Sequence, residues 1–456
     1  MKKLLLAGII LFGFRAMAVQ QPNIILILAD DMGYSDVGFN GCTDIPTPNL
    51  DALAASGVRF EQGYVSASVC GPSRAGLLTG RYQQRFGCGE NPPEEGWPEH
   101  PRCPDAGVPL TEQMLGELLK PAGYRTGVIG KWHMGMAHNL RPNQRGFDYF
   151  YGFLNGAHSF TEAEKKWQPN PGFWPVFRNN EPLDYEGYLT DTFTDESIAF
   201  IERNKAAPFF LYLSYNAVHA PWQAPDNVAH KVTHIKDDYR RTYAGMLVSM
   251  DDGIGRVVQA LEDCGVRENT VVVFLSDNGA PKNSAAGSDP LRGNKGDTYE
   301  GGTRVPFVLS WPNKLPAGTV YDYPVSALDL APTFTKLAVA VDAKNGFDGV
   351  DLMPYLKGKE KGRPHEIMFF RRDSDYAIRT GDWKLSWNDG NPNGSRQMEL
   401  FNLAEDPYES VNLIKQHPEK ARQLQKQFDA WDSKQPDNEW WGGPHNRKRP
   451  NTVSAK

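Results

Sequence analysis

The chain has 456 residues and a mass of 50.9 kDa, which predicts one large domain with a smaller one appended. Its 40% hydrophobic and 23% charged residues are enough for a sizeable core, which excludes a fibrous or disordered protein. A formal net charge of -6 excludes a nucleic-acid coat and argues against binding to an anionic membrane surface. The five cysteines are too few for a disulfide scaffold, and their odd number leaves at least one that cannot pair within the chain.

Residues 1–18 have the pattern of a secretory signal peptide. Lys2 and Lys3 precede an apolar run over residues 4–14, and Ala-Met-Ala at 16–18 offers a cleavage site. This run is shorter than the roughly 20 apolar residues of a membrane-spanning helix. We therefore expect an exported protein, periplasmic or secreted, with no membrane anchor.

Four apolar runs predict strands that are buried on both faces, and each ends just before polar residues. The runs are Asn23–Leu28, Arg125–Ile129, Phe209–Tyr215 and Thr270–Ser276. Helical patterns lie between them, at Pro48–Ser56, Leu110–Lys120, Asp195–Asn204 and Tyr239–Glu262. This alternation predicts an α/β fold with a large, mostly parallel sheet sandwiched by helices. Because ligands bind beyond the carboxyl ends of parallel strands, the polar residues that close the four strands should converge on one site.

The pattern changes after about Gly346. Short strands are predicted at Glu366–Arg372, Asp375–Arg379 and Trp383–Trp387, followed by a helix at Glu419–Trp431. We therefore expect a catalytic α/β domain over residues 19–345 and a smaller α+β domain with an antiparallel sheet over 346–434. Residues 435–456 would form a C-terminal tail or loop.

The segment Cys70-Gly71-Pro72-Ser73-Arg74 is the most informative motif of the sequence. Pro72 suits the first turn of a helix, whose N-terminus would then lie beside Cys70. Such an end favours an anionic ligand and would lower the pKa of a thiol. A cysteine at a helix start is by itself more often structural.

The same five residues resemble the Cys-x-Pro-Ser-Arg signature of the formylglycine-dependent, type I sulfatases of the alkaline phosphatase superfamily. The resemblance implies an alkaline phosphatase-like fold and a maturation enzyme that oxidises Cys70 to formylglycine. The hydrated aldehyde would then attack the sulfur of a sulfate ester, with a nucleophile that no standard side chain supplies. Among these enzymes, the chain is similar to the bacterial polysaccharide and N-acetylgalactosamine-type sulfatases.

Asp30-Asp31, after the first predicted strand, and Asp277-Asn278, after the fourth, resemble the two metal-binding segments of this family. Each aspartate could instead simply occupy a turn after a strand. The resemblance implies that these four residues, together with the oxidised Cys70, bind one metal ion per active site. Such a shell contains only oxygen ligands, which suits the hard cation Ca²⁺ rather than zinc.

Further segments resemble the blocks that supply catalytic side chains in this family, namely residues 130–135 (GKWHMG), 218–221 (VHAP) and 291–296 (LRGNKG). The resemblance implies that Lys131 and Lys295 bind the sulfate oxygens and that His133 contacts the formylglycine hydroxyls. Lys131 and His133, two residues apart on an extended stretch, should project to the same side. His219 would protonate the departing alcohol, which suits a side chain with a pKa near neutrality. Arg74 would support the formylglycine oxygens and the metal-bound carboxylates.

Aromatic residues are dense between Phe147 and Trp174 and recur at Trp440-Trp441. Sugars stack on such rings, although each ring taken singly more often fills a core. Together with export, these rings favour a sulfated carbohydrate or polysaccharide of the galactose or N-acetylgalactosamine sulfate type. The expected substrate contacts are Lys131, His219, Lys295 and His158.

Two other functions stay open at this point. A phosphate or phosphonate ester hydrolase of the same superfamily would share most of these residues, and some such enzymes also carry formylglycine. An inactive, carbohydrate-binding relative would lack a catalytic residue, whereas all the positions named above are present.

Conversion of Cys70 would explain the odd number of cysteines, since it leaves Cys42, Cys88, Cys103 and Cys264. Cys88 and Cys103 are the pair we expect first, because they bracket a loop rich in Pro and Gly. Further along, Glu399–Glu409 resembles a strand and turn found in the small domain of many sulfatases.

Overall fold

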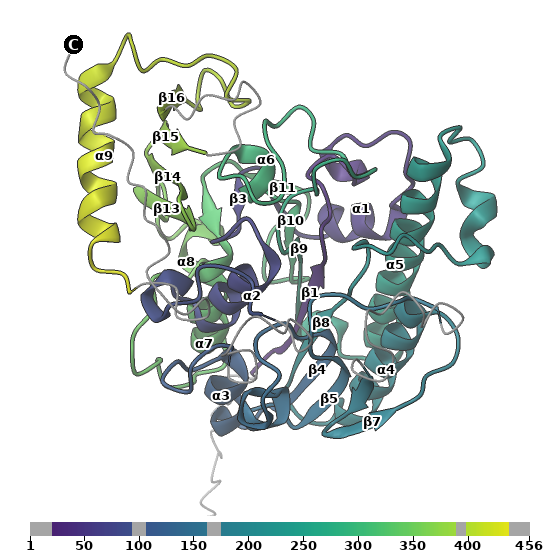
Figure 1. Cartoon of the computed structure of the whole chain (residues 1–456). Coiled ribbons are helices and arrows are strands. Elements are labelled where there is room, and N and C mark those ends of the chain that lie inside the picture. Colours follow the sequence, from purple (N-terminus) through teal and green to yellow (C-terminus); the bar gives the residue numbers. More distant parts are fainter. Residues whose placement is uncertain (1–20, 94–105, 162–174, 389–397, 437–456) are drawn as a thin grey trace, which may run out of the picture.

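The computed structural model describes residues 21–93, 106–161, 175–388 and 398–436. A mixed sheet of ten strands lies between two layers of helices, and a second sheet of four strands lies beside it (Figure 1). The predicted signal peptide, Cys103, Trp174 and Trp440-Trp441 fall outside the described residues. Among the described helices, none combines the length and apolar character that crossing a membrane requires.

The five central strands of the large sheet run parallel and include the four strands that the sequence predicts. Across the sheet they are β9 (Thr270–Ser276), β1 (Asn23–Ala29), β8 (Phe209–Ser214), β4 (Arg125–Lys131) and β5 (Tyr149–Phe153). Antiparallel pairing begins on both flanks, where β10 (Phe307–Ser310) joins β9 and β6 (Val176–Arg178) joins β5. The outer strands are β2 (Val58–Phe60), β11 (Thr319–Tyr321) and β7 (Glu181–Leu183), while β3 (Gly63–Tyr64) and β12 (Val325–Ser326) pair separately. The α/β prediction is therefore confirmed, with a parallel centre and mostly antiparallel flanks.

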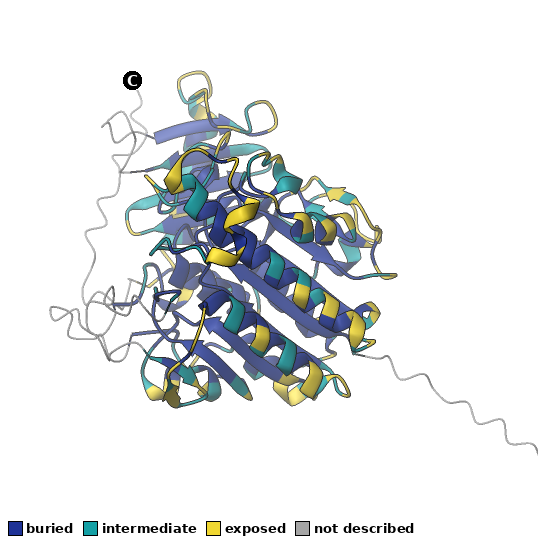
Figure 2. Cartoon of the chain, turned by 90° about the vertical axis from the view of Figure 1, so that its right-hand side faces the viewer, coloured by how far each residue is buried: buried dark blue, intermediate teal, exposed yellow. Residues whose placement is uncertain are grey.

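Helices cover both faces of the sheet, because the central strands carry apolar side chains on both faces. Ile25 and Ile27 of β1 pack into one core with α1 (Pro48–Ala55), α4 (Leu189–Asn204) and α5 (Asp238–Asp263). Leu26 and Leu28 pack into the other with α2 (Cys70–Thr79), α3 (Leu115–Leu119) and α7 (Leu330–Leu337). Each such fully buried side chain contributes roughly 2 kcal/mol. Figure 2 shows the two long helices of the first layer in front of the sheet, with their exposed residues on the outer side.

The helix predicted at Leu110–Lys120 is shorter than expected. It begins only at Leu115, because Met114 is extended and its backbone N–H donates to Glu117 Oε2 at 2.9 Å. Leu110 is 56% exposed, so the apolar pattern that suggested a longer helix does not reflect a buried face. In contrast, α4 starts six residues before the predicted Asp195, where Leu189 and Phe193 join the core.

The C-terminal part forms the predicted antiparallel sheet with one helix against it (Figure 1). Its strands are β13 (Ile367–Arg372), β14 (Asp375–Thr380), β15 (Trp383–Trp387) and β16 (Met398–Asn402), and the helix is α9 (Pro418–Asp432). Leu424 and Phe428 of α9 pack on Ile378 and Leu385 of the sheet. Before it, α8 (Met353–Leu356) packs into the core of the larger domain. The domain boundary after residue 345 stays a prediction.

Candidate active site

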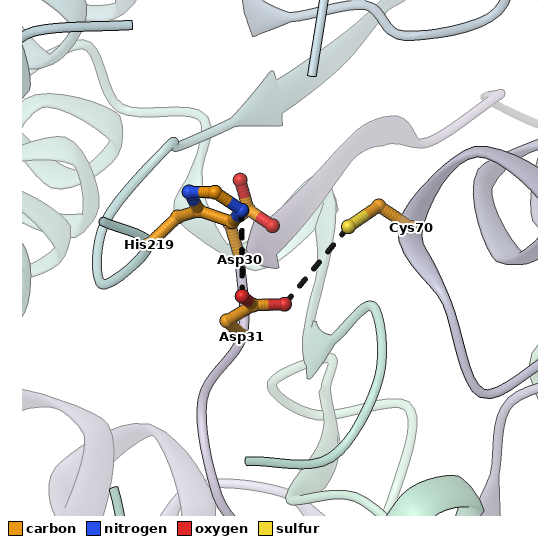
Figure 3. Close-up of side chains that lie close together, drawn as sticks. All are labelled: Asp30, Asp31, Cys70 and His219. Carbon is orange, nitrogen blue, oxygen red and sulfur yellow. Dashed lines mark hydrogen bonds and ion pairs between the residues drawn. The ribbon is translucent and has the colours of Figure 1, made fainter. Parts of the chain in front are cut away.

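The carboxyl ends of the central parallel strands bring the predicted polar residues together, as the sequence suggested. Asp30-Asp31 follow β1, Lys131 ends β4, His219 lies shortly after β8 and Asp277-Asn278 follow β9, while Cys70 and Arg74 come from the start of α2. Ligand atoms of Asp30, Asp31, Cys70 and His219 all lie within 4.8 Å of one another. Figure 3 shows Asp31 between the thiol of Cys70 and the imidazole of His219.

Asp31 is at the centre of this cluster. Its Oδ1 lies 3.9 Å from Cys70 Sγ, and its Oδ2 lies 3.4 Å from His219 Nε2. Lys295 Nζ contacts the same carboxylate at 2.6 Å. Lys295 comes from the loop between β9 and α6 (Glu300–Thr303), 264 residues along the chain from Asp31.

Two fully buried cations pair with the other carboxylates. Lys131 Nζ donates to Asp30 Oδ2 at 2.7 Å, and Arg74 contacts Asp277 Oδ2 through Nε at 2.9 Å and a terminal nitrogen at 2.8 Å. The side chains of Lys131, Arg74 and Asp30 have no exposed area. Removing one member of such a pair leaves the other charge buried without a partner, which costs about 3–5 kcal/mol of stability.

Only two of the predicted catalytic side chains keep appreciable contact with solvent. His219 is 19% and Lys295 18% exposed, whereas those of Lys131 and Arg74 are wholly buried. A substrate therefore has to approach from the side of His219 and Lys295. The buried cations and carboxylates form the floor of the site.

The surroundings change the pKa values of the carboxylates in opposite directions. Burial raises the pKa of Asp30, but the charges of Lys131, His219, Arg74 and Lys295 together outweigh this effect and the net shift is downward. Burial and the neighbouring Asp30 raise the pKa of Asp277 to about 6, even though Arg74 opposes the shift. The charge of Asp30 is therefore firmly held, whereas Asp277 depends on Arg74.

The prediction that the helix start lowers the pKa of the Cys70 thiol is wrong. Burial raises this pKa to about 12, and the nearby Lys131 and Lys295 only partly compensate. Cys70 is 2% exposed, and the pull of a helix N-terminus is smaller than the cost of placing a thiolate in so dry a position. Unmodified Cys70 is therefore a poor nucleophile at neutral pH.

The donor set is suitable for a hard metal ion. Asp30 Oδ1 and Asn278 Oδ1 are buried and accept no hydrogen bond from any described residue. Buried oxygens of this kind normally have a partner, and a cation would provide one. Asp31 and Asp277 add two carboxylates, so the residues expected to bind a metal are all at the site.

The two remaining histidines have different surroundings. The stretch carrying Lys131 and His133 is not extended throughout, because His133 has a φ of 59°. His133 nevertheless lies beside the start of α2, since a Cβ on Gly71 would come 3.3 Å from its carbonyl oxygen. Burial is the main cause that lowers the pKa of His133 well below its usual value, and the charge of Lys131 adds to it, so the ring is neutral. His158 is buried between Phe153 and Tyr185, and its predicted contact with substrate stays a prediction.

The aromatic residues described in the 147–161 region belong to the cores. Phe147 and Phe150 lie on one face of the sheet, and Tyr151 and Phe153 on the other. All four are almost completely buried, so they are not a platform for a sugar. The alternation of side chains between the two faces of β5 could have indicated from the sequence that these rings belong to the cores.

Sequence reasoning missed Asp36, which holds the loop after Asp31. Its carboxylate accepts hydrogen bonds from Gly33 N at 3.0 Å, Tyr243 OH at 2.6 Å and Arg240 at 2.7 Å. Asp36 is completely buried. Nothing in the local sequence distinguishes it from an ordinary turn aspartate, because its partners come from α5, about 200 residues away.

Comparison with known proteins gives a consistent set of relatives. Residues 22–340 match the family model described as Sulfatase, and residues 294–434 match the model of the C-terminal part of N-sulphoglucosamine sulphohydrolase. N-acetylgalactosamine-6-sulfatase of Mus musculus is 36% identical over 387 residues, which cover 80% of this chain and 72% of that protein. The uncharacterized sulfatase YdeN of Escherichia coli strain K12 is 30% identical over 503 residues, covering 89% and 84%.

Solved structures agree. The crystal structure of Ps i-CgsB is 38% identical, with a TM-score of 0.85, and covers 92% of this chain and 95% of that chain. Ps i-CgsB has also been solved in complex with k-i-k-neocarrahexaose. The PsFucS1 sulfatase from Pseudoalteromonas sp. is 27% identical, with a TM-score of 0.77 and coverage of 93% and 91%.

Proposed function

Because the chain belongs to the sulfatase family and is a sulfuric ester hydrolase, we propose that its substrate is a sulfated carbohydrate. The favoured sugars are sulfated galactose and N-acetylgalactosamine. One observation carries the proposal: Cys70, four oxygen-bearing side chains and three cations come together from separate segments, beside the partly exposed side chains of His219 and Lys295. Such a site suits an anionic ester group that enters with its sulfate first and leaves its alcohol at the exposed side.

Two groups are implied by the family and fit this site. Asp30, Asp31, Asp277 and Asn278, with an oxygen at residue 70, would hold a divalent cation, for which an oxygen-only shell favours Ca²⁺. The cation supplies charge to polarise the sulfate, and formylglycine at residue 70 supplies a hydrated-aldehyde hydroxyl as nucleophile.

The chain's own cations provide the rest of the sulfate site. Lys131 and Lys295 lie on either side of the Asp30-Asp31 pair and offset the negative charge of sulfate oxygens. Arg74 fixes Asp277 and donates to the carbonyl oxygen of Lys131 at 3.2 Å, so it links the carboxylate and the lysine. His133, whose backbone lies beside the start of α2, is the residue we expect to donate a hydrogen bond to the nucleophile at residue 70.

His219 is placed to deliver a proton to the departing alcohol. Its Nδ1 lies 2.7 Å from the carbonyl oxygen of Ala220, which can only accept, so Nδ1 carries a hydrogen. The catalytic proton would therefore be carried by Nε2, which lies 3.4 Å from Asp31, whose charge favours the protonated ring. Burial lowers the pKa of His219 and Asp31 opposes this shift, a balance that favours release of the proton.

The choice of sugar rests on the relatives. N-acetylgalactosamine-6-sulfatase is a curated relative, and Ps i-CgsB was solved with k-i-k-neocarrahexaose. The signal peptide predicted at residues 1–18 supports export to the periplasm or outside the cell, where an enzyme can reach sulfated polysaccharides. A formylglycine-generating enzyme would be the partner that matures Cys70.

A panel of sulfated oligosaccharides tests this proposal. We expect the purified protein to release free sulfate from galactose or N-acetylgalactosamine sulfates, and product analysis gives the position of the ester. An aryl phosphonate serves as the competing substrate. A higher kcat/KM on the phosphonate than on a matched aryl sulfate would contradict the proposal.

Replacing His219 with alanine should have an effect that depends on the leaving group. For a sugar alcohol, whose alkoxide is strongly basic, we expect kcat to fall about 10³-fold, as for loss of general-acid help. For 4-nitrophenyl sulfate, whose leaving group needs no proton, the loss should stay within about tenfold. Equal losses on both substrates would remove the assigned role. His234→Ala is the control, because His234 bonds to the carbonyl oxygen of Asp44 on the surface.

A further inference from the structure

The loop that carries Lys295, residues 292–301, is closed on itself. At its base, Gly301 N donates to the carbonyl oxygen of Arg292 at 2.7 Å. At its tip, Lys295 N donates to Ala280 O at 2.7 Å, and Gly296 N donates to Ser68 O at 2.8 Å. The tip is therefore held by the larger domain. One of its contacts, with Ser68, lies two residues from Cys70 in the chain. The base has different partners.

The smaller domain holds the base of the Lys295 loop (Figure 1). The guanidinium of Arg292 lies 2.9 Å from Glu399 on β16, and the hydroxyl of Tyr299 donates to the same carboxylate. Arg292 also stacks 4.1 Å above the ring of Tyr299. Next to them, Thr298 N donates to Asn388 Oδ1 at 2.7 Å. Both sides of the loop are thus tied to the antiparallel sheet.

Glu409 makes a second attachment. Its Oε2 accepts from Glu300 N at 2.7 Å, and its carbonyl oxygen accepts from Arg292 at 3.1 Å. Lys384 Nζ lies 2.8 Å from Glu300 and 2.9 Å from Glu409, and none of these three side chains is more than 1% exposed. Glu409 has a φ of 56°, so a turn presents it to the loop. The two end residues of the segment Glu399–Glu409 therefore both contact the loop.

We propose that Arg292, Tyr299, Glu399 and Glu409 are positioning residues that fix the ammonium of Lys295 for sulfate. The proposal rests on the proposed role of Lys295 as a sulfate ligand. A lysine has a long side chain with many rotamers, and its usefulness depends on where its backbone is held. The main-chain hydrogen bonds at the tip fix the position of the tip, and the contacts with the smaller domain fix the orientation of the loop. The smaller domain thereby takes part in binding through the Lys295 loop.

A pair of matched tyrosine variants separates positioning from general stability. Tyr299→Phe removes the hydroxyl bound to Glu399, whereas Tyr82→Phe removes a hydroxyl that joins the two domains elsewhere, by accepting from Phe369 N at 3.2 Å. Each is made in the wild-type chain and in Lys295→Ala. The measurements are kcat/KM on 4-nitrophenyl sulfate, binding of inorganic sulfate by titration calorimetry, and the melting temperature.

We expect Tyr299→Phe to lower kcat/KM and sulfate affinity about tenfold in the wild-type chain, the effect of one charge-assisted hydrogen bond. In Lys295→Ala the same change should cost less than about twofold, because nothing is left to position. Tyr82→Phe should stay within about twofold in both backgrounds, with a similar fall in melting temperature. The sulfate titration gives the same comparison if Lys295→Ala has no measurable turnover.

Two outcomes would overturn the proposal in different ways. Equal losses from Tyr299→Phe in both backgrounds, or no loss in either, would leave Lys295 its role but remove that of the smaller domain. A Lys295→Ala protein with wild-type sulfate affinity and turnover would remove the role of Lys295 itself.

Discussion

Replacing Cys70 with alanine is expected to abolish sulfate release, with kcat lower by about 10⁴-fold or more. The reason lies in the position of the residue. Cys70 begins α2, is 2% exposed and lies 3.9 Å from Asp31. Burial raises the pKa of its thiol to about 12, which makes the unconverted thiol a poor nucleophile, so the proposed mechanism requires conversion of this side chain. Alanine cannot be converted.

Steady-state release of sulfate from an aryl sulfate is the measurement, and Cys264→Ala is the matched control. Cys264 is a half-buried cysteine at the end of α5. The control should keep full activity and the normal melting temperature. Mass spectrometry of the Cys70 peptide from an active preparation should show the aldehyde in place of the thiol. A Cys70→Ala protein that still turns over, or an active protein that carries only thiol, would refute the proposed mechanism.

Replacing Asp31 with asparagine is expected to lower kcat about 10³-fold and to remove the response of the protein to calcium. Asp30 is held by Lys131 and Asp277 by Arg74, whereas Asp31 faces Lys295 and the partly exposed His219. The change keeps the size of the side chain but removes one negative charge next to three cations. We therefore expect a divalent cation to bind more weakly, because two carboxylates no longer balance Arg74, Lys131 and Lys295.

The binding of the metal can be followed without activity. A bound ion stabilises the folded state, so chelation should lower the melting temperature of the wild-type protein and Ca²⁺ should restore it. Asp31→Asn should show neither effect. Asp252→Asn, which alters a surface pair with Lys231, should behave like the wild type. An unchanged response to chelation in Asp31→Asn would exclude Asp31 as a ligand.

Much of the catalytic domain could be predicted from the sequence. The run Asn23–Leu28 is apolar at every position after the first, which is typical of a strand covered on both faces. Since the central strands are parallel, their ends share one edge, and Asp31, Lys131 and Asp277 meet there. The short flanking strands could not be predicted in this way, because β2 has only three residues and β10 only four, too few to show a pattern.

Which residues meet at the site could be predicted before the structure, because four apolar runs each end at polar residues and because the remaining motifs resemble those of one family. How those residues behave depends on the packed molecule. Burial raised the pKa of Cys70, against the expectation from its helix, and left His219 and Lys295 as the exposed side of the site. Packing between the domains brought Glu399 and Glu409 to the Lys295 loop, about 100 residues away in the chain. Solvation and long-range contacts depend on the whole packed molecule, so no local pattern contains them.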